Sequence, residues 1–108
     1  MILVDPGTLT TEEGGTIAEF RTDASYQGLY VLENGEVYAV NPHISIKVNN
    51  EMSFGNAYYI GKVIYPDRFA DIDPAAKSDE IYQFMVDTTV YEQLKLHVQN
   101  QSYQKVNE

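Results

Sequence analysis

The sequence predicts an α+β domain in which five to six antiparallel strands form a small β-barrel or a strongly twisted sheet, followed by C-terminal helices. The chain has 108 residues, enough for one hydrophobic core. The part before Pro66 is rich in β-forming residues, and the apolar residues after it take helical spacing. We therefore expect a single globular domain over residues 1–108, with a loop-rich N-terminal segment at 5–15 and a frayed polar tail at 100–108.

The first predicted strands lie in the N-terminal third. Residues 2–4 are expected to form a short strand, and residues 16–21 a second one, because both runs are rich in strand formers. Two β-rich runs in residues 28–40 flank Asn34-Gly35, the preferred pair for a type I′ turn. This pattern predicts a β-hairpin. Both of its faces are apolar, so we expect both to be covered, as in a closed barrel or a sheet with a helix packed on it.

Two further strands are predicted in the middle of the chain. Residues 43–48 alternate between apolar and polar side chains, which is typical of a half-exposed strand. An exposed edge strand there would allow pairing with a second copy in a homodimer. Residues 57–65 form the other strand, in which Gly61 indicates a bulge or a barrel corner.

Local signals predict a helix over residues 75–86. Asp73 suits the N-cap and Pro74 the first helical position, because Asp accepts hydrogen bonds from free N–H groups and Pro has no N–H to leave unpaired. The inner face of this helix is expected to carry Ile81, Phe84, Met85 and Thr88.

Residues 89–100 allow two interpretations. Thr89 and Glu92 have the spacing of a capping box, which would open a second helix. The apolar residues from Leu94 to Val98 alternate, as they would in a closing strand. We favour the helix, since Glu92 breaks the alternation.

Composition excludes several classes of protein. Without cysteine there are no disulfides, thiolate nucleophiles or zinc sites that need sulfur. No signal peptide and no apolar run near the ~20 residues of a membrane span is recognisable, so we expect a cytoplasmic protein with no membrane partner. Sixteen Asp and Glu against seven Lys and Arg give a net charge of −9, which disfavours a broad electrostatic grip on nucleic acid.

No catalytic constellation is recognisable. His43 and His97 are the two histidines, with no partner motif near either, and no serine lies in a G-x-S-x-G elbow. The carboxylates between Asp67 and Glu80 lie before and within the start of a helix, where the helix dipole explains them better than a metal ion does. We therefore expect a non-enzymatic protein with no cofactor and no metal.

The least acidic part of the chain is the candidate binding site. Residues 37–66 have a net charge of +1, whereas the remainder carries −10. Lysines bind phosphates, and tyrosines on strands can stack on nucleobases. The leading interpretation is therefore a regulatory protein that acts by binding through this region, with RNA or another regulatory protein as its partner. Two tyrosines would lie on opposite faces of the strand at 57–65. The candidate residues are Lys47, Lys62, Tyr58, Tyr59 and His43.

Two alternatives stay open. The chain could be an acidic inhibitor whose carboxylates imitate nucleic-acid phosphates and block a basic protein. The carboxylates that crowd its first third are Glu12, Glu13, Glu19, Asp23, Glu33 and Glu36. It could also be a small enzyme or ligand-binding barrel that uses paired carboxylates or a histidine.

One resemblance to a known family covers most of the chain. Residues 13–20 read Glu-Gly-Gly-Thr-Ile-Ala-Glu-Phe and lead into residues 28–35, Gly-Leu-Tyr-Val-Leu-Glu-Asn-Gly. With the small acidic β-then-α plan, they resemble the PrgU-like regulatory proteins of enterococcal conjugative plasmids. The resemblance implies a PUA-like β-barrel flanked by helices, RNA as partner, and a role in limiting the expression of conjugation or surface-adhesin genes. It carries no diagnostic motif, so it assigns no functional residue.

Overall fold

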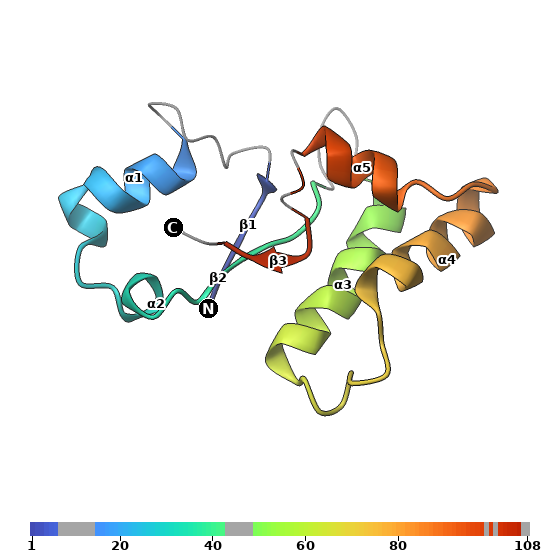
Figure 1. Ribbon diagram of the computed structural model, residues 1–108, viewed down its shortest axis with the longest axis horizontal. Helices are drawn as coiled ribbons and strands as arrows, with labels where there is room; N and C mark the ends of the chain where they lie inside the picture. Colours follow the sequence, from blue (N-terminus) through green and yellow to red (C-terminus); the bar gives the residue numbers. More distant parts are fainter. Residues whose placement is uncertain (7–14, 43–48, 99, 101, 107–108) are drawn as a thin grey trace.

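The chain folds into an α+β domain with one helical layer on each side of a small sheet (Figure 1). The computed structural model describes residues 1–6, 15–42, 49–98, 100 and 102–106. The elements in chain order are β1 (Ile2–Val4), α1 (Thr16–Thr22), the 3-10 helix η2 (Ala24–Tyr26), α2 (Tyr30–Glu33), β2 (Val37–Ala39), α3 (Asn50–Ile64), α4 (Pro74–Val86), α5 (Tyr91–His97) and β3 (Gln104–Lys105). Among the described residues, no helix is both long and apolar enough to cross a membrane.

The sheet is open and mixed, with β2 in the centre, parallel to β1 and antiparallel to β3. Tyr38 on β2 lies opposite Leu3 on one side and Lys105 on the other. The predicted barrel of five to six antiparallel strands is therefore wrong. Strands of two or three residues give too little ladder to curl and close into a barrel.

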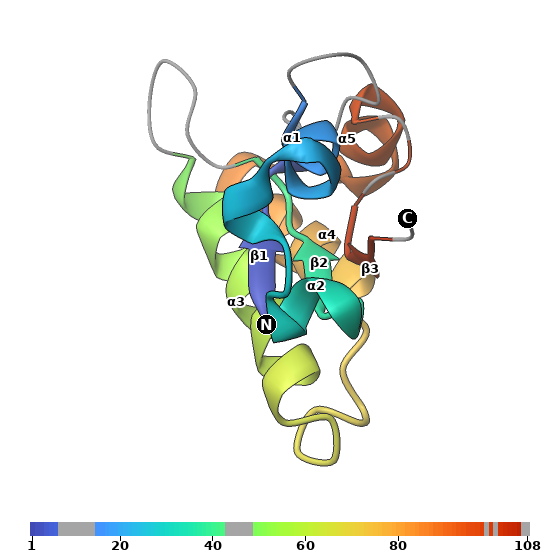
Figure 2. The same ribbon diagram turned by 90° about the vertical axis from the view of Figure 1, so that its left-hand side faces the viewer.

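The three layers are clear in two orthogonal views. Helices α1 and α2 lie on one side of the sheet, and α3, α4 and α5 lie on the other (Figures 1 and 2). The apolar core toward α1 and α2 is built on the buried residues Val4, Val37 and Ala39. Phe20 from α1 and Leu32 from α2 pack against it. These helices therefore cover the apolar face that the short strands could not bury alone.

The predicted hairpin around Asn34-Gly35 is a helix end instead. Asn34 has φ −94° and ψ 2°, whereas a type I′ turn needs positive φ at both central residues. Gly35 has φ 64°, and the N–H of Glu36 donates to the carbonyl of Val31 at 2.7 Å while that of Gly35 donates to Leu32 at 3.2 Å. This pair of bonds is the Schellman ending of α2. Asn-Gly fits both structures, and β2 pairs with β1 rather than with the preceding run.

Two other predicted strands are helical. Residues 16–21 fall in α1, and residues 57–65 form the second half of α3 and its C-cap. The buried residues of α3 are Met52, Gly55, Asn56 and Tyr59. Their spacing is helical, so burial of one helical face overrides the β propensity of the Tyr, Ile and Val residues. The strand predicted at 43–48, with its dimer edge, lies outside the described residues.

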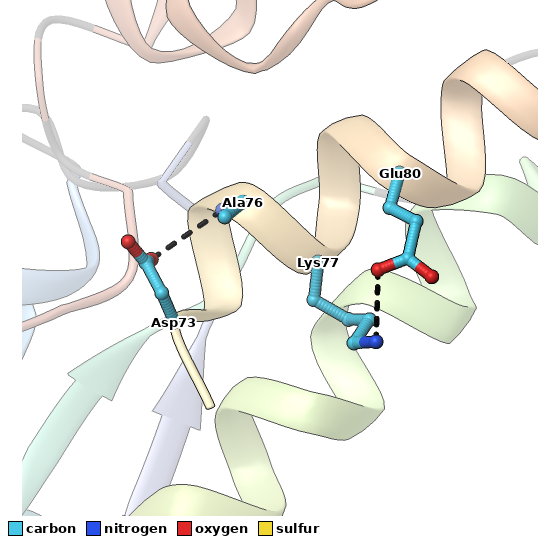
Figure 3. A network of polar contacts seen from close by, with 4 residues as sticks. All are labelled: Asp73, Ala76, Lys77 and Glu80. Carbon is cyan, nitrogen blue, oxygen red and sulfur yellow. Dashed lines mark hydrogen bonds and ion pairs between the residues drawn. The ribbon is translucent and has the colours of Figure 1, made fainter. Parts of the chain in front are cut away.

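Helix α4 confirms the predicted start and corrects the predicted face. The Oδ1 of Asp73 accepts hydrogen bonds from the backbone N–H of Ala75 at 3.0 Å and of Ala76 at 3.4 Å (Figure 3). Ser78 and Tyr82 are the buried residues, whereas Phe84, predicted to face inward, is 90% exposed. The inner face of α4 is therefore polar at its centre.

Helix α5 confirms the helical interpretation of the region after α4, but its cap comes from elsewhere. Its N-cap, Val90, makes no side-chain capping bond, and the capping box predicted from Thr89 to Glu92 is absent. Instead the Oδ1 of Asp79 on α4 accepts from the N–H groups of Val90 and Tyr91, each at 3.0 Å. A carboxylate of α4 therefore caps the N-terminus of α5.

Replacement of Asp79 by alanine should destabilise the fold through this cap. Asp79→Ala leaves the N–H groups of the N-cap Val90 and of Tyr91, the first residue of α5, without their acceptor, so we expect the free energy of unfolding to fall by about 1–2 kcal/mol in urea titrations. Thr89→Ala is the matched control and should change it by less than about 0.5 kcal/mol. An equal loss in both variants would instead support the capping box.

Candidate functional site

The described residues of the predicted binding site lie on one helix, α3. Tyr58, Tyr59 and Lys62 are all in its second half. Consecutive residues on a helix are about 100° apart rather than on opposite faces. Lys47 and His43 fall within 43–48, outside the described residues. The structure therefore brings together three of the five predicted residues, in a geometry that differs from the strand that was expected.

All three side chains are engaged within the protein, Lys62 and Tyr58 by polar contacts and Tyr59 by burial. The Nζ of Lys62 donates a hydrogen bond to the backbone carbonyl of Ile72, which fixes the connection between α3 and α4. The Nζ of Lys77 on α4 lies 5.3 Å from the ring centroid of half-buried Tyr58. Lys62 thus has an internal acceptor and Tyr58 an internal cation, which leaves less of either for an external ligand.

Tyr59 is part of a buried aromatic group that we call the tyrosine cluster, made of Tyr59, Tyr91 and Tyr103. Tyr59 is only 7% exposed, and its ring stacks on that of Tyr103 with centroids 4.8 Å apart. Tyr91 stacks on Tyr103 at 5.5 Å. These aromatic rings join α3, α5 and the C-terminal segment, so Tyr59 is not placed to stack on a nucleobase.

Hydrogen bonds extend the tyrosine cluster into a buried polar network. The Ser78 and Tyr103 hydroxyls lie 3.0 Å apart, and Ser102 Oγ donates to Asn41 Oδ1 at 2.6 Å. The carboxamide of Asn56 binds the backbone of Asn41 through two hydrogen bonds, of 2.9 Å to its N–H and 2.7 Å to its carbonyl. The network therefore connects the end of β2 with α3, α4 and the C-terminal segment.

Burial sets the protonation of the tyrosine cluster. It raises the pKa of Tyr59 to about 12 and that of Tyr103 to about 12, the latter against an opposing hydrogen bond with Ser78. Burial also raises the pKa of Tyr91. These phenols stay neutral near pH 7, so they serve as stacking and hydrogen-bonding groups rather than as bases. Within the described ranges, no group of three or more histidine or carboxylate side chains is placed to hold a metal ion.

An exposed apolar and acidic surface lies where α4 ends and α5 begins. We call residues 80–92 the α4–α5 corner; it contains three carboxylates and no basic residue. The ring of Phe84 is 90% exposed, and Met85 and Val86 beside it are exposed as well. Large apolar side chains gathered on a surface usually mark a contact with another molecule.

The geometry of α4 explains why Phe84 points outward. Ser78 and Tyr82, one turn apart, face α3 and the C-terminal segment, and Phe84 lies about 200° around the helix from Tyr82. Glu80 shares the outer face with Phe84 and pairs with Lys77 at 2.9 Å (Figure 3). This surface was not predicted, because apolar residues at helical spacing were assigned to the core. The available signal was the Ser78 and Tyr82 pair, whose spacing marks an alternative inner face.

Gly55 offers a test of the polar network. A Cβ at this position would lie 2.5 Å from Ser78 Oγ and 2.8 Å from the Tyr103 hydroxyl. Gly55→Ala should therefore lower the free energy of unfolding by about 1–3 kcal/mol in urea titrations, although alanine is the better helix former. The loss should shrink in a Ser78→Ala background. Equal losses in both backgrounds would contradict the contact.

Alkaline pH should destabilise the protein through the tyrosine cluster. In the unfolded chain tyrosines ionise near pH 10, whereas folded Tyr59 and Tyr103 keep their protons until about pH 12. The unfolded state then binds fewer protons, so the free energy of unfolding should fall as the pH rises from about 10 to about 12. Urea titrations across this range measure the fall, and Tyr103→Phe should make it shallower. Titration of every tyrosine near pH 10 in the folded protein would refute the expectation.

No protein-family model matches the chain, and no curated protein matches it either. The resemblance to the PrgU-like proteins therefore stays a prediction, and the β-barrel that it implied is not the observed fold.

Proposed function

We propose that the protein is non-enzymatic and that it binds a basic partner protein through the α4–α5 corner. The observation that carries the proposal is the ring of Phe84, 90% exposed in a stretch, residues 80–92, that carries three carboxylates and no basic residue of its own. This is the acidic-inhibitor alternative from the sequence, moved from the first third of the chain to the corner.

The energetics of such a contact favour Phe84 as its anchor. Burial of one aromatic side chain contributes about 1.5–3 kcal/mol, and aromatic residues in fully desolvated pockets dominate many interfaces. The exposed carboxylates of Asp87 and Glu92 in the same stretch would attract a basic partner and select against an acidic one. The partner should therefore offer an apolar pocket with basic residues around its rim.

RNA binding through α3 has less support. Lys62 donates to a backbone carbonyl and Tyr59 is buried, so neither is free for phosphates or bases. The net charge of −9 also opposes binding to phosphates. RNA binding stays a prediction that rests on Lys47 and His43, outside the described residues.

Affinity purification with matched variants tests the proposed function. Tagged protein should retain a basic protein that survives nuclease and leaves at high salt, because exposed charge pairs are screened by salt. Phe84→Ala should weaken purified partner binding by roughly tenfold or more, as measured by calorimetry. Leu96→Ala is the control, since Leu96 is 68% exposed but lies outside the corner; it should bind as the wild type does.

Three outcomes would contradict the proposed function. Equal binding by the wild type and Phe84→Ala would remove the corner as the site. Equal losses of partner binding in Phe84→Ala and Leu96→Ala would mean nonspecific hydrophobic binding rather than a defined surface. Recovery of RNA that nuclease removes, with no retained protein, would favour the RNA interpretation.

A further inference from the structure

A cavity of about 240 Å³ lies between the sheet and the layer of α1, η2 and α2. Leu32, Val37 and Val106 give it an apolar wall, continuous with the core on this face of the sheet. Phe20 and Tyr26 form an aromatic corner, with ring centroids 5.2 Å apart and planes at 74°. Such a corner offers one ring face and one ring edge to a further aromatic ring.

The size of the cavity restricts its ligand. An engineered apolar cavity of about 150 Å³ holds benzene. Pockets for drug-sized molecules run from about 300 to 1,000 Å³. A cavity between these limits has room for a single six-membered ring with a short substituent.

Two opposite charges lie at the same cavity. Arg21 comes from the last turn of α1 and Glu33 from the last turn of α2, and both line the cavity. They form no ion pair with each other within the described part of the chain. Gln27 Nε2 donates to the backbone carbonyl of Arg21 at 3.1 Å, which holds the end of α1 beside the cavity. The site therefore offers one cationic and one anionic partner at a fixed apolar wall.

Two of the residues that line the cavity are glycines with positive φ. Gly28 and Gly35 line it with φ of 79° and 64°, a backbone conformation that other residues rarely adopt. A Cβ at Gly28 would meet no atom within 4 Å, so the space beside it is open.

We propose that this cavity binds a small zwitterion with one aromatic ring, of the class of the free aromatic α-amino acids. The ring lies against Phe20 and Tyr26, the carboxylate pairs with the guanidinium of Arg21, and the ammonium pairs with the carboxylate of Glu33. The cavity and the α4–α5 corner belong to layers on opposite sides of the sheet (Figures 1 and 2). This inference therefore goes beyond the proposed function and does not depend on it.

The test is an NMR titration of the full chain with phenylalanine. Shifts should concentrate at Phe20, Tyr26 and Leu32. Phenethylamine lacks the carboxylate and phenylacetate lacks the ammonium, so each should bind about tenfold more weakly, as should phenylalanine to Arg21→Gln and Glu33→Gln protein. Glu19→Gln is the matched control, because Glu19 is an exposed carboxylate on α1 that does not line the cavity. It should leave the affinity unchanged.

The same experiment can overturn the inference. No shift at millimolar phenylalanine would show that the cavity is not a site for this class. Equal binding of phenylalanine, phenethylamine and phenylacetate would show a merely apolar cavity. Equal binding to the wild type and to both charge variants would remove Arg21 and Glu33 from the site. Loss of binding in Glu19→Gln as well would indicate a general charge effect.

Discussion

The pairing of the Asn56 carboxamide with the backbone of Asn41 is the contact on which the rest of the structure depends. Strands of two or three residues do not form a stable sheet alone, so this sheet needs a support. Asn41 follows β2, and the two buried hydrogen bonds from Asn56 attach it to the middle of α3. Ser102 then binds the side chain of Asn41 and brings the C-terminal segment to the edge of β2, where β3 pairs. Because removal of one partner would leave buried polar groups unpaired, the network gives the fold specificity as well as cohesion.

The C-terminal segment completes this network in a strained conformation. Asn100 and Tyr103 have φ of 62° and 48°, and a bulky residue in that region costs about 1–2 kcal/mol. Tyr103 compensates with two stacked rings and a hydrogen bond to Ser78. Much of the aromatic content therefore stabilises the interior. Phe84, at 90%, is the most exposed of the described aromatic rings that remain outside, ahead of Tyr30 at 73%, Tyr65 at 56% and Phe54 at 53%.

Local signals predicted part of the fold, and non-local contacts decided the rest. The pair Asp73-Pro74 predicts the start of α4, because the capping residue and its N–H partners are close together in the sequence. Asn34-Gly35 suits both a type I′ turn and a Schellman ending, and only the pairing of β2 with β1 distinguishes them. The cap of α5 comes from Asp79, more than ten positions earlier, which no local pattern reveals. The candidate surface was missed for a related reason, since the buried face of α4 is defined by partners on other elements.

Some of the acidic residues have contacts within the fold, and these can be separated from the carboxylates that remain for a partner. Asp73 caps α4, Asp79 caps α5 and Glu80 pairs with Lys77, so these three carboxylates stabilise the helical layer. The positions of the remaining carboxylates therefore matter more for a partner than the net charge of −9. A surface that was acidic only for solubility would not need an exposed phenylalanine ring, because such a ring favours aggregation. The proposed basic partner would cover the ring and meet the charge together at the α4–α5 corner.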